Sequence, residues 1–434
     1  MKLALQWQIL IAVAAAVAIG SLLGALDSAF KAGTGTHDAA PYLKGVAMVA
    51  AMFLNALKML IVPLILSALM NGMIGGAEQG GLGRLGLLTA GFYIGTGLIA
   101  ILTGLAWCNL LTPGIINGVP AGKLLGLSAD TASVLSEVQG KGAQDLWSVL
   151  VRMIPTNPVQ AAASGDMLGL VTFGLLFGWA CTLLPVELRN VQGQFWKGVY
   201  EAMTNITGLV MLFAPIGVFA VVVGTVAKTG MAALQPLAIF MVAVIGGLLT
   251  HALVTLPIVL KFIARIPPYK FLKHMAPALL TGFSTSSSNA TLPMTMDCIE
   301  NAVKVPRRVS GFVLPIGANV NTDGSALYEC VAAIFIAQAY GLHLTFGGQF
   351  TVVLLALITA VGVAGIPSAS LVAIAVILSA IGLPLEGVGL ILAVDRVLDM
   401  CRTSLNVLGD SSATVFVARL SGEEGVMGLP ALKR

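Results

Sequence analysis

Charged residues are scarce in this chain. Only 10% of its 434 residues are Asp, Glu, Lys or Arg, whereas 57% are hydrophobic. Soluble globular domains carry about 25% charged residues, so this composition excludes a chain that keeps its whole surface in water. The composition predicts a multi-pass membrane protein with lipid as its solvent. The expected location is the cell (inner) membrane.

Cysteine and histidine are also rare, at five and four residues respectively. The cysteines are scattered through apolar segments without paired or metal-ligand spacing, which indicates neither a disulfide framework nor a zinc site. Ser286–Ser288 resembles the nucleophile of an intramembrane hydrolase, but no histidine has a spacing that offers a Ser/His/Asp arrangement. The sequence therefore favours a protein that is not an enzyme and holds no cofactor, with the hydrolase as a remote alternative.

What the chain has instead is long apolar runs. Each of six runs approaches or exceeds the roughly 20 residues that cross a hydrocarbon core as a helix. They are Gln8–Leu26, Val46–Leu69, Leu87–Leu111, Leu168–Leu184, Met203–Val226 and Pro236–Ile263. The first run has no clear small-residue cleavage site after it, so it is interpreted as a transmembrane helix rather than a signal peptide.

After Pro267 the apolar stretches are interrupted by polar and glycine-rich patches. Irregular backbone in lipid would leave unpaired amides, so such patches must face protein or a water-filled cavity. Paired broken segments in corresponding positions are typical of inverted-repeat transporters, although serine and glycine in membrane helices also serve close packing. The four patches are Ser284–Pro293, Gly317–Ser325, Gly362–Ser370 and Asp395–Asp410.

The last patch places its charges on one face of a helix. At about 100° per residue, its polar side chains fall within roughly 100° of arc. Turning these charges toward lipid would cost about 3 kcal/mol or more apiece, so the face must line a polar interior. The residues that share it are Asp395, Asp399, Arg402, Thr403, Asn406 and Asp410.

Two interpretations of this face are open. A purely structural network would pair Arg402 with Asp395 or Asp399 and leave Asp410 without a partner. In the functional interpretation, Arg402 is a lone buried cation that receives a carboxylate, while Asp399 holds an ammonium group. Together they predict a receptor for an acidic amino acid. A simple dicarboxylate, a neutral amino acid and cystine are the alternative cargoes.

With these residues in view, the chain resembles the dicarboxylate/amino acid:cation symporter family of glutamate and aspartate transporters. The motifs that carry the resemblance are IPTNP at Ile154–Pro158, APIGVFA at Ala214–Ala220 and LDMCRTSLNVLGD at Leu398–Asp410. The resemblance implies secondary active symport of an acidic amino acid with sodium ions, protons or both as coupling ions. It implies an acidic amino acid and the lipid bilayer as partners, and no nucleic acid.

The same resemblance implies an all-α polytopic membrane fold with eight transmembrane helices, two re-entrant hairpins and inverted repeats. The chain, 1–434, would be a single symporter unit that assembles as a homotrimer and works as an elevator. The scaffold would comprise 1–78 and 146–230, and the moving transport part 84–112 and 233–420. The hairpins would lie at 268–303 and 347–380.

Residues that match the family motifs are expected to bind the substrate. The resemblance implies that Arg402 grips the side-chain carboxylate, that Asp399 and Thr403 hold the amino group, and that Asn406 approaches the backbone carboxylate. Ser325 would reach the side-chain carboxylate, and the two hairpin tips would contribute the remaining contacts. The tip residues are Ser287, Ser288, Ile366 and Ser370.

Two cation sites follow from the same match. One would consist of Asp410, Asn406, Asn321 and the Gly317 carbonyl, and the other of Asp323, Asn321, Tyr93 and Thr96.

Four positions depart from the family pattern. Thr322 replaces a methionine, Gly97 removes a hydroxyl, and Ser286 and Met400 occupy the two places where relatives carry a second arginine. Glu329 is a candidate proton carrier, with a neutral buried acid as the alternative, so proton coupling is open beside sodium coupling.

Overall fold

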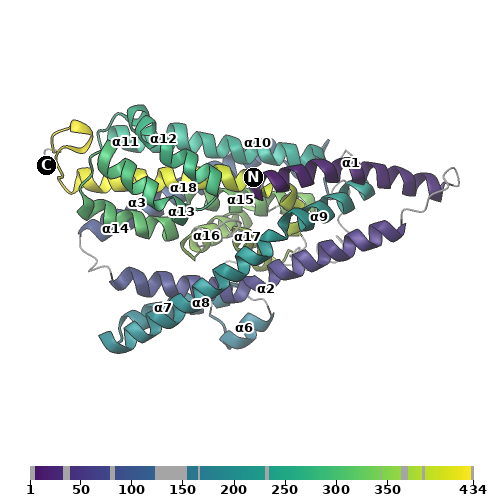
Figure 1. Ribbon diagram of the computed structural model, residues 1–434, viewed down its shortest axis with the longest axis horizontal. Helices are drawn as coiled ribbons and strands as arrows, with labels where there is room; N and C mark the ends of the chain where they lie inside the picture. The colour runs from purple at the N-terminus through teal and green to yellow at the C-terminus, as the bar shows by residue number, and fades with distance from the viewer. Residues whose placement is uncertain are drawn as a thin grey trace.

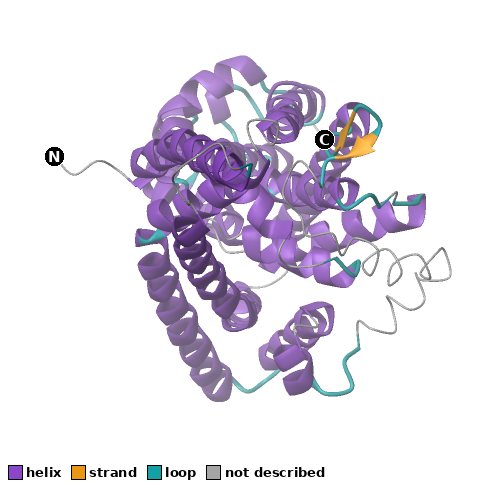
Figure 2. Cartoon of the chain, turned by 90° about the vertical axis from the view of Figure 1, so that its right-hand side faces the viewer, coloured by secondary structure: helices purple, strands orange, loops and turns teal. Residues whose placement is uncertain are grey.

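The computed structural model describes residues 5–32, 40–78, 84–122, 154–164, 167–229, 234–342, 344–362, 370–383 and 387–431. These residues are mostly helical, as expected for an all-α membrane transporter (Figure 1). The only strands in this part of the chain are the two-residue strands β1 (Ile115–Ile116) and β2 (Val119–Pro120), drawn in orange in Figure 2.

Several predicted apolar runs are long helices. Three segments are long and apolar enough to cross a membrane: Ile11–Lys31, Arg84–Leu111 and Leu234–Phe262. They belong to α1 (Leu5–Lys31), to α3 (Arg84–Leu111), and to α10 (Leu234–Thr250) with its continuation through η2 (His251–Thr255) and α11 (Leu256–Phe262). The runs Val46–Leu69 and Leu168–Leu184 correspond to α2 (Ala40–Glu78) and α7 (Met167–Thr182), and α7 follows the short α6 (Pro158–Ser164).

The predicted run Met203–Val226 is not one continuous helix, which corrects the expectation of a simple span. It is divided between α8 (Val186–Leu212) and α9 (Ala214–Thr229), whose described parts meet at 56°. Pro215 explains the break, because proline donates no backbone hydrogen bond and its ring clashes with the carbonyl one turn earlier. Apolar composition alone does not predict this break between the two helices.

Two pairs of helices occupy the segments 268–303 and 347–380. The first consists of α12 (Pro268–Thr285), α13 (Ser288–Asp297) and the π-helical turn η3 (Cys298–Ala302). The second consists of α16 (Phe346–Gly362) and α17 (Ser370–Ala380), and the residues between them lie outside the described part of the chain. Their re-entrant course in a membrane stays a prediction.

The remaining helices of this half carry the polar patches. α14 (Arg307–Val320) ends and α15 (Asp323–Ala339) begins on either side of Asn321 and Thr322, within the second patch. The fourth patch lies inside the continuous α18 (Val388–Leu420), and the short 3-10 helix η5 (Val426–Gly428) follows it. α15 is buried over nearly its whole length because α3, α10, α16, α17 and α18 surround it.

The helices pack in two groups. One group, whose members pack mainly on one another, consists of α1, α2, α7, α8 and α9. The other group consists of α3, α10 and the helices that follow α10 in the chain. Figure 1 shows α2, α7 and α8 beneath the layer that contains α10 and α18.

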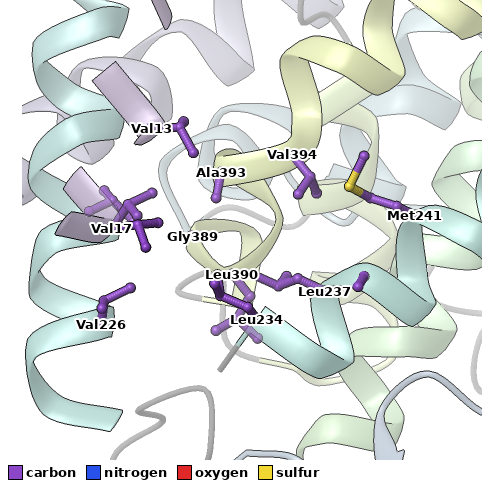
Figure 3. Close-up of a pocket in the computed structure, with 13 residues that line it drawn as sticks. Val13, Val17, Val226, Leu234, Leu237, Met241, Gly389, Leu390, Ala393 and Val394 are labelled. Carbon is purple, nitrogen blue, oxygen red and sulfur yellow. The ribbon is translucent and has the colours of Figure 1, made fainter. Parts of the chain in front are cut away.

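A cavity of about 160 Å³ lies where the two groups meet. Its lining comes from α1, α9, α10 and α18, including Val17, Val226, Leu237 and Leu390 (Figure 3). Every lining residue is apolar or glycine, so packing rather than hydrogen bonding joins the two groups at this place.

Candidate functional site

The centre of the polar interior is the guanidinium of Arg402 on α18. Its side chain is 1% exposed. Nε and Nη2 donate to Asp399 Oδ1 at 3.1 and 2.8 Å, and Nη1 donates to Asp395 Oδ1 at 3.1 Å. Residues three and seven positions apart share one face of a helix, which is why the local fold brings these three together.

A tyrosine on the neighbouring helix α15 completes this arrangement. Tyr328 Oη donates to Asp395 Oδ1 at 2.9 Å, and the guanidinium carbon of Arg402 lies 4.2 Å from the centre of the Tyr328 ring. The face of the Tyr328 ring attracts the cation. Asp395 Oδ1, which accepts from both Tyr328 and Arg402, fixes one edge of the guanidinium. Asp395 and Tyr328 therefore anchor Arg402 to the protein independently of Asp399.

Arg402 is not the lone buried cation that the helical stripe suggested. Arg396 is also buried, with its side chain 7% exposed, and its Nη1 lies 3.4 Å from Asp399 Oδ2. The set of residues predicted to share the polar face of α18 does not include Arg396, because Arg396 lies about 100° around the helix from Asp395, at the edge of that face. Two protein carboxylates, those of Asp395 and Asp399, pair with Arg402, as in the structural interpretation of the sequence.

Asn406 fastens α18 to the first turn of α15. Its Oδ1 accepts from Gly324 N at 2.8 Å, and its Nδ2 donates to Ser325 Oγ at 3.2 Å. A Cβ added at Gly324 would lie 2.6 Å from the carbonyl oxygen of Arg402. Glycine at this position thus permits the close approach that brings two predicted substrate residues, Asn406 and Ser325, into contact.

The tip of the first helical pair lies against α18. Ser286 adopts a left-handed conformation with φ 51°, and Ser287 Oγ caps α13 by accepting from Ala290 N at 3.3 Å. A Cβ at Gly282 would lie 3.6 Å from the Thr403 carbonyl oxygen, so the end of α12 runs close to α18 at the predicted substrate residue Thr403.

Two other predicted substrate residues lie in the two helical pairs. Ser288 begins α13 and Ser370 begins α17, and both are buried. Ile366 lies outside the described residues.

The first predicted cation site gathers oxygen atoms around Asp410. Asn321 Nδ2 donates to Asp410 Oδ1 at 3.0 Å, which gives Asp410 the partner that a purely structural network was expected to lack. A Cβ at Gly317 would lie 2.6 Å from both Asp410 Oδ1 and Tyr93 Oη, so these groups crowd the end of α14. Asn321 Oδ1 is buried and finds no hydrogen-bond donor among the described residues. An unpaired buried oxygen beside a carboxylate suits a hard cation.

The second predicted cation site centres on Asp323. Thr96 Oγ1 lies 3.4 Å from Asp323 Oδ1, and His251 Nε2 lies 3.3 Å from Asp323 Oδ2. His251 is fully buried on the π-helical turn η2. The turn arises where Pro257 cannot donate to the carbonyl one turn earlier. Sequence reasoning missed His251, whose only signal is an isolated histidine in an apolar span.

The departures from the family pattern have local consequences. Thr322 Oγ1 donates to the Ala360 carbonyl at 3.0 Å, which ties the break between α14 and α15 to α16. A Cβ at Gly97 would lie 3.4 Å from Asp323 Oδ1, so a larger residue at Gly97 would approach that carboxylate.

Glu329 is a carboxyl group inside the apolar core of α15. It is fully buried, and Thr359 Oγ1 donates to its Oε2 at 3.0 Å. Its Oε1 finds no hydrogen-bond partner among the described residues. A carboxyl buried in an apolar core is costly to ionise.

Comparison with known proteins places these residues in a family context. The model of the sodium:dicarboxylate symporter family matches residues 5–420. The chain is 33% identical over 420 residues to the proton/glutamate-aspartate symporter of Escherichia coli (strain K12), covering 96% of this chain and 93% of that protein. It is 32% identical over 422 residues to the proton/sodium-glutamate symport protein of Geobacillus stearothermophilus, covering 97% and 96%. It is also 32% identical over 455 residues to excitatory amino acid transporter 1 of Ambystoma tigrinum, covering 94% and 82%.

Proposed function

This chain belongs to the sodium:dicarboxylate symporter family, and we propose that it carries glutamate or aspartate across the cell membrane by cation-coupled symport. The observation that carries the proposal is the α18 face, where the buried guanidinium of Arg402 lies between the carboxylates of Asp395 and Asp399. An acidic amino acid presents the complementary groups, a side-chain carboxylate and an ammonium.

Binding is an exchange of ion-pair partners on this face. The substrate carboxylate takes donors from Arg402, which stays anchored on Asp395 and over the Tyr328 ring. Asp399 then accepts from the substrate ammonium in place of Arg402. The ion pair between Arg402 and Asp399 is replaced by one between Arg402 and the substrate carboxylate and one between Asp399 and the substrate ammonium. Neither buried charge is therefore left without a partner, with or without substrate.

Polar groups around this exchange complete the proposed substrate site. Thr403 assists Asp399 with the amino group, and Asn406 and Ser325 form a hydrogen-bonded pair beside the substrate. The serines of the first tip, Ser287 and Ser288, close one side. Ile366 and Ser370 of the second pair serve as the gate.

We assign cation coupling to the oxygen-rich groups around Asp410 and Asp323. Asp410, Asn321, Asn406 and the Gly317 carbonyl hold one sodium, and the unpaired Asn321 Oδ1 supports that assignment. A second sodium would use Asp323, Asn321, Tyr93 and Thr96.

Protons have a separate candidate carrier. Glu329, a buried carboxyl that accepts from the Thr359 hydroxyl inside an apolar core, carries a proton. The two bacterial relatives are named for proton and for proton/sodium coupling, which supports both possibilities.

The proposed architecture has eight transmembrane helices and two re-entrant hairpins in a homotrimer. Residues 84–112 and 233–420 move as a transport part against a scaffold of 1–78 and 146–230. The separate packing of the two helix groups supports this division, as does the apolar cavity between them. Apolar contacts such as those around this cavity permit the sliding that an elevator needs.

Uptake into proteoliposomes tests the proposal. Purified protein is reconstituted, an inward sodium gradient and an inward proton gradient are imposed separately, and radiolabelled L-aspartate and L-glutamate are supplied in turn. We expect accumulation of at least one amino acid above its equilibrium level under at least one gradient, with the product chemically unchanged. Equilibration without accumulation under every gradient would contradict symport, and conversion of the substrate would point to an enzyme.

A further inference from the structure

Two buried arginines share the carboxylate of Asp399. Arg402 donates to Oδ1 through Nε at 3.1 Å and Nη2 at 2.8 Å, whereas Arg396 approaches Oδ2 through Nη1 at 3.4 Å. Each arginine therefore faces a different oxygen. Because a carboxylate accepts hydrogen bonds at both oxygens, one partner can leave without displacing the other.

The charges of this group balance only if Arg396 is included. Asp395 and Asp399 supply two negative charges, and Arg396 and Arg402 supply two positive charges. An acidic amino acid brings two carboxylates and one ammonium, hence a net charge of −1. Without Arg396 the group would already carry −1 when empty, and a second buried negative charge would be added on binding. Such uncompensated charge opposes acidic cargo specifically.

Arg396 differs from Arg419, another buried arginine of α18. Arg419 donates to backbone carbonyl oxygens: its Nε donates to that of Ala264 at 3.2 Å, and its Nη1 donates to that of Pro430. The Nε of Arg396 is buried and finds no acceptor among the described residues, and its contact with Asp399 is longer than a normal charged hydrogen bond. Arg419 thus ties helices together, whereas Arg396 keeps unused donor capacity beside the exchanging carboxylate.

We propose that Arg396 is a positioning residue that determines specificity for acidic cargo. It holds Asp399 through Oδ2 while Oδ1 passes from Arg402 to the substrate ammonium, and its charge offsets that of the additional carboxylate. This inference rests on the proposed function, since it assigns a role within the same site. It adds to that site a residue that the helical stripe did not include.

Three variants test the inference in the full-length protein reconstituted into proteoliposomes. Arg396→Gln removes the charge, Arg396→Lys keeps it, and Arg419→Gln is the matched control for loss of a buried arginine on the same helix. Initial rates of L-aspartate uptake give KM and the maximal rate for each. Competition by L-asparagine, which has the same shape without the side-chain charge, gives the preference for acidic over neutral cargo.

We expect Arg396→Gln to raise KM for aspartate about tenfold or more, with a smaller change in maximal rate, and to lower the aspartate-to-asparagine preference by a similar factor. Arg396→Lys should keep most of the preference, and Arg419→Gln should keep both KM and preference. A merely structural arginine would change protein yield and maximal rate without moving the preference.

Wild-type KM and wild-type preference in Arg396→Gln would overturn the inference. If that variant is not recovered folded, Arg396→Lys decides alone, because a folded lysine variant that loses the preference contradicts the role of charge. Absence of both aspartate and glutamate uptake by the wild-type protein would instead refute the proposed function, so the two failures are distinguishable.

Discussion

At the scale of single residues, the site depends on how Arg402 is held. Three of its donors reach two carboxylates, and it is 1% exposed. Sequence periodicity predicts that these residues meet, because positions 395, 399 and 402 share a helical face. It does not predict the second guanidinium at Arg396 or the histidine beside Asp323, since contacts at the edge of a stripe and between distant helices depend on the packed structure.

Replacing Arg402 tests its role as the carboxylate receptor. We expect Arg402→Ala to weaken aspartate binding by about a hundredfold or more, because removing one member of a buried charged pair costs about 2–5 kcal/mol. Arg402→Lys should give an intermediate loss, since it keeps the charge without the two-pronged geometry. Titration calorimetry of purified, monodisperse variants measures both. Near wild-type affinity in a folded alanine variant would refute the assignment.

Glu329 offers a test of proton coupling. If its carboxyl carries the proton, Glu329→Gln abolishes uptake driven by a pH gradient while exchange of aspartate across the membrane persists, because glutamine cannot cycle a proton. Glu300→Gln is the matched control, since Glu300 also accepts from a hydroxyl, that of Ser310 at 2.7 Å, outside the site. Unchanged pH-driven uptake in Glu329→Gln would exclude Glu329 as the carrier.

At the scale of helices, composition predicts spans better than interruptions. The runs within α1, α3 and α10 are recovered as long helices because hydrophobic length is a direct requirement of the bilayer. The bend between α8 and α9 is missed because a single proline decides it within an apolar run. The break between α14 and α15 is visible in advance because glycine and polar residues cluster there at membrane depth.

The junction of α15 and α18 gives a prediction at this scale. We expect Gly324→Ala to lower both the thermal unfolding midpoint and aspartate affinity, because its Cβ would lie 2.6 Å from the Arg402 carbonyl oxygen and must separate the helices. Gly95→Ala on α3 is the control, since a Cβ there meets nothing within 4 Å. Thermal unfolding and calorimetry of both variants check this. Equal behaviour of the two would show that close approach at Gly324 is dispensable.

At the scale of the whole molecule, the two helix groups meet at the apolar cavity in Figure 3. Filling this cavity with a larger side chain should hinder movement of one helix group against the other. We expect Ala393→Trp to lower the maximal uptake rate about tenfold while aspartate affinity stays near that of the wild type, since motion rather than binding is obstructed. Leu249→Trp is the control, because Leu249 is an exposed position on α10. A parallel loss of affinity, or no loss of rate, would argue against movement at this interface.

In the proposed site, one buried face recognises an ammonium group and an additional carboxylate together. Calorimetric titration of the purified wild-type protein with L-aspartate, L-asparagine and succinate tests it most directly, at fixed pH and with saturating sodium. Asparagine lacks the side-chain charge and succinate lacks the ammonium, so each should bind at least about tenfold more weakly than aspartate. Succinate or asparagine binding as tightly as aspartate would contradict the claim.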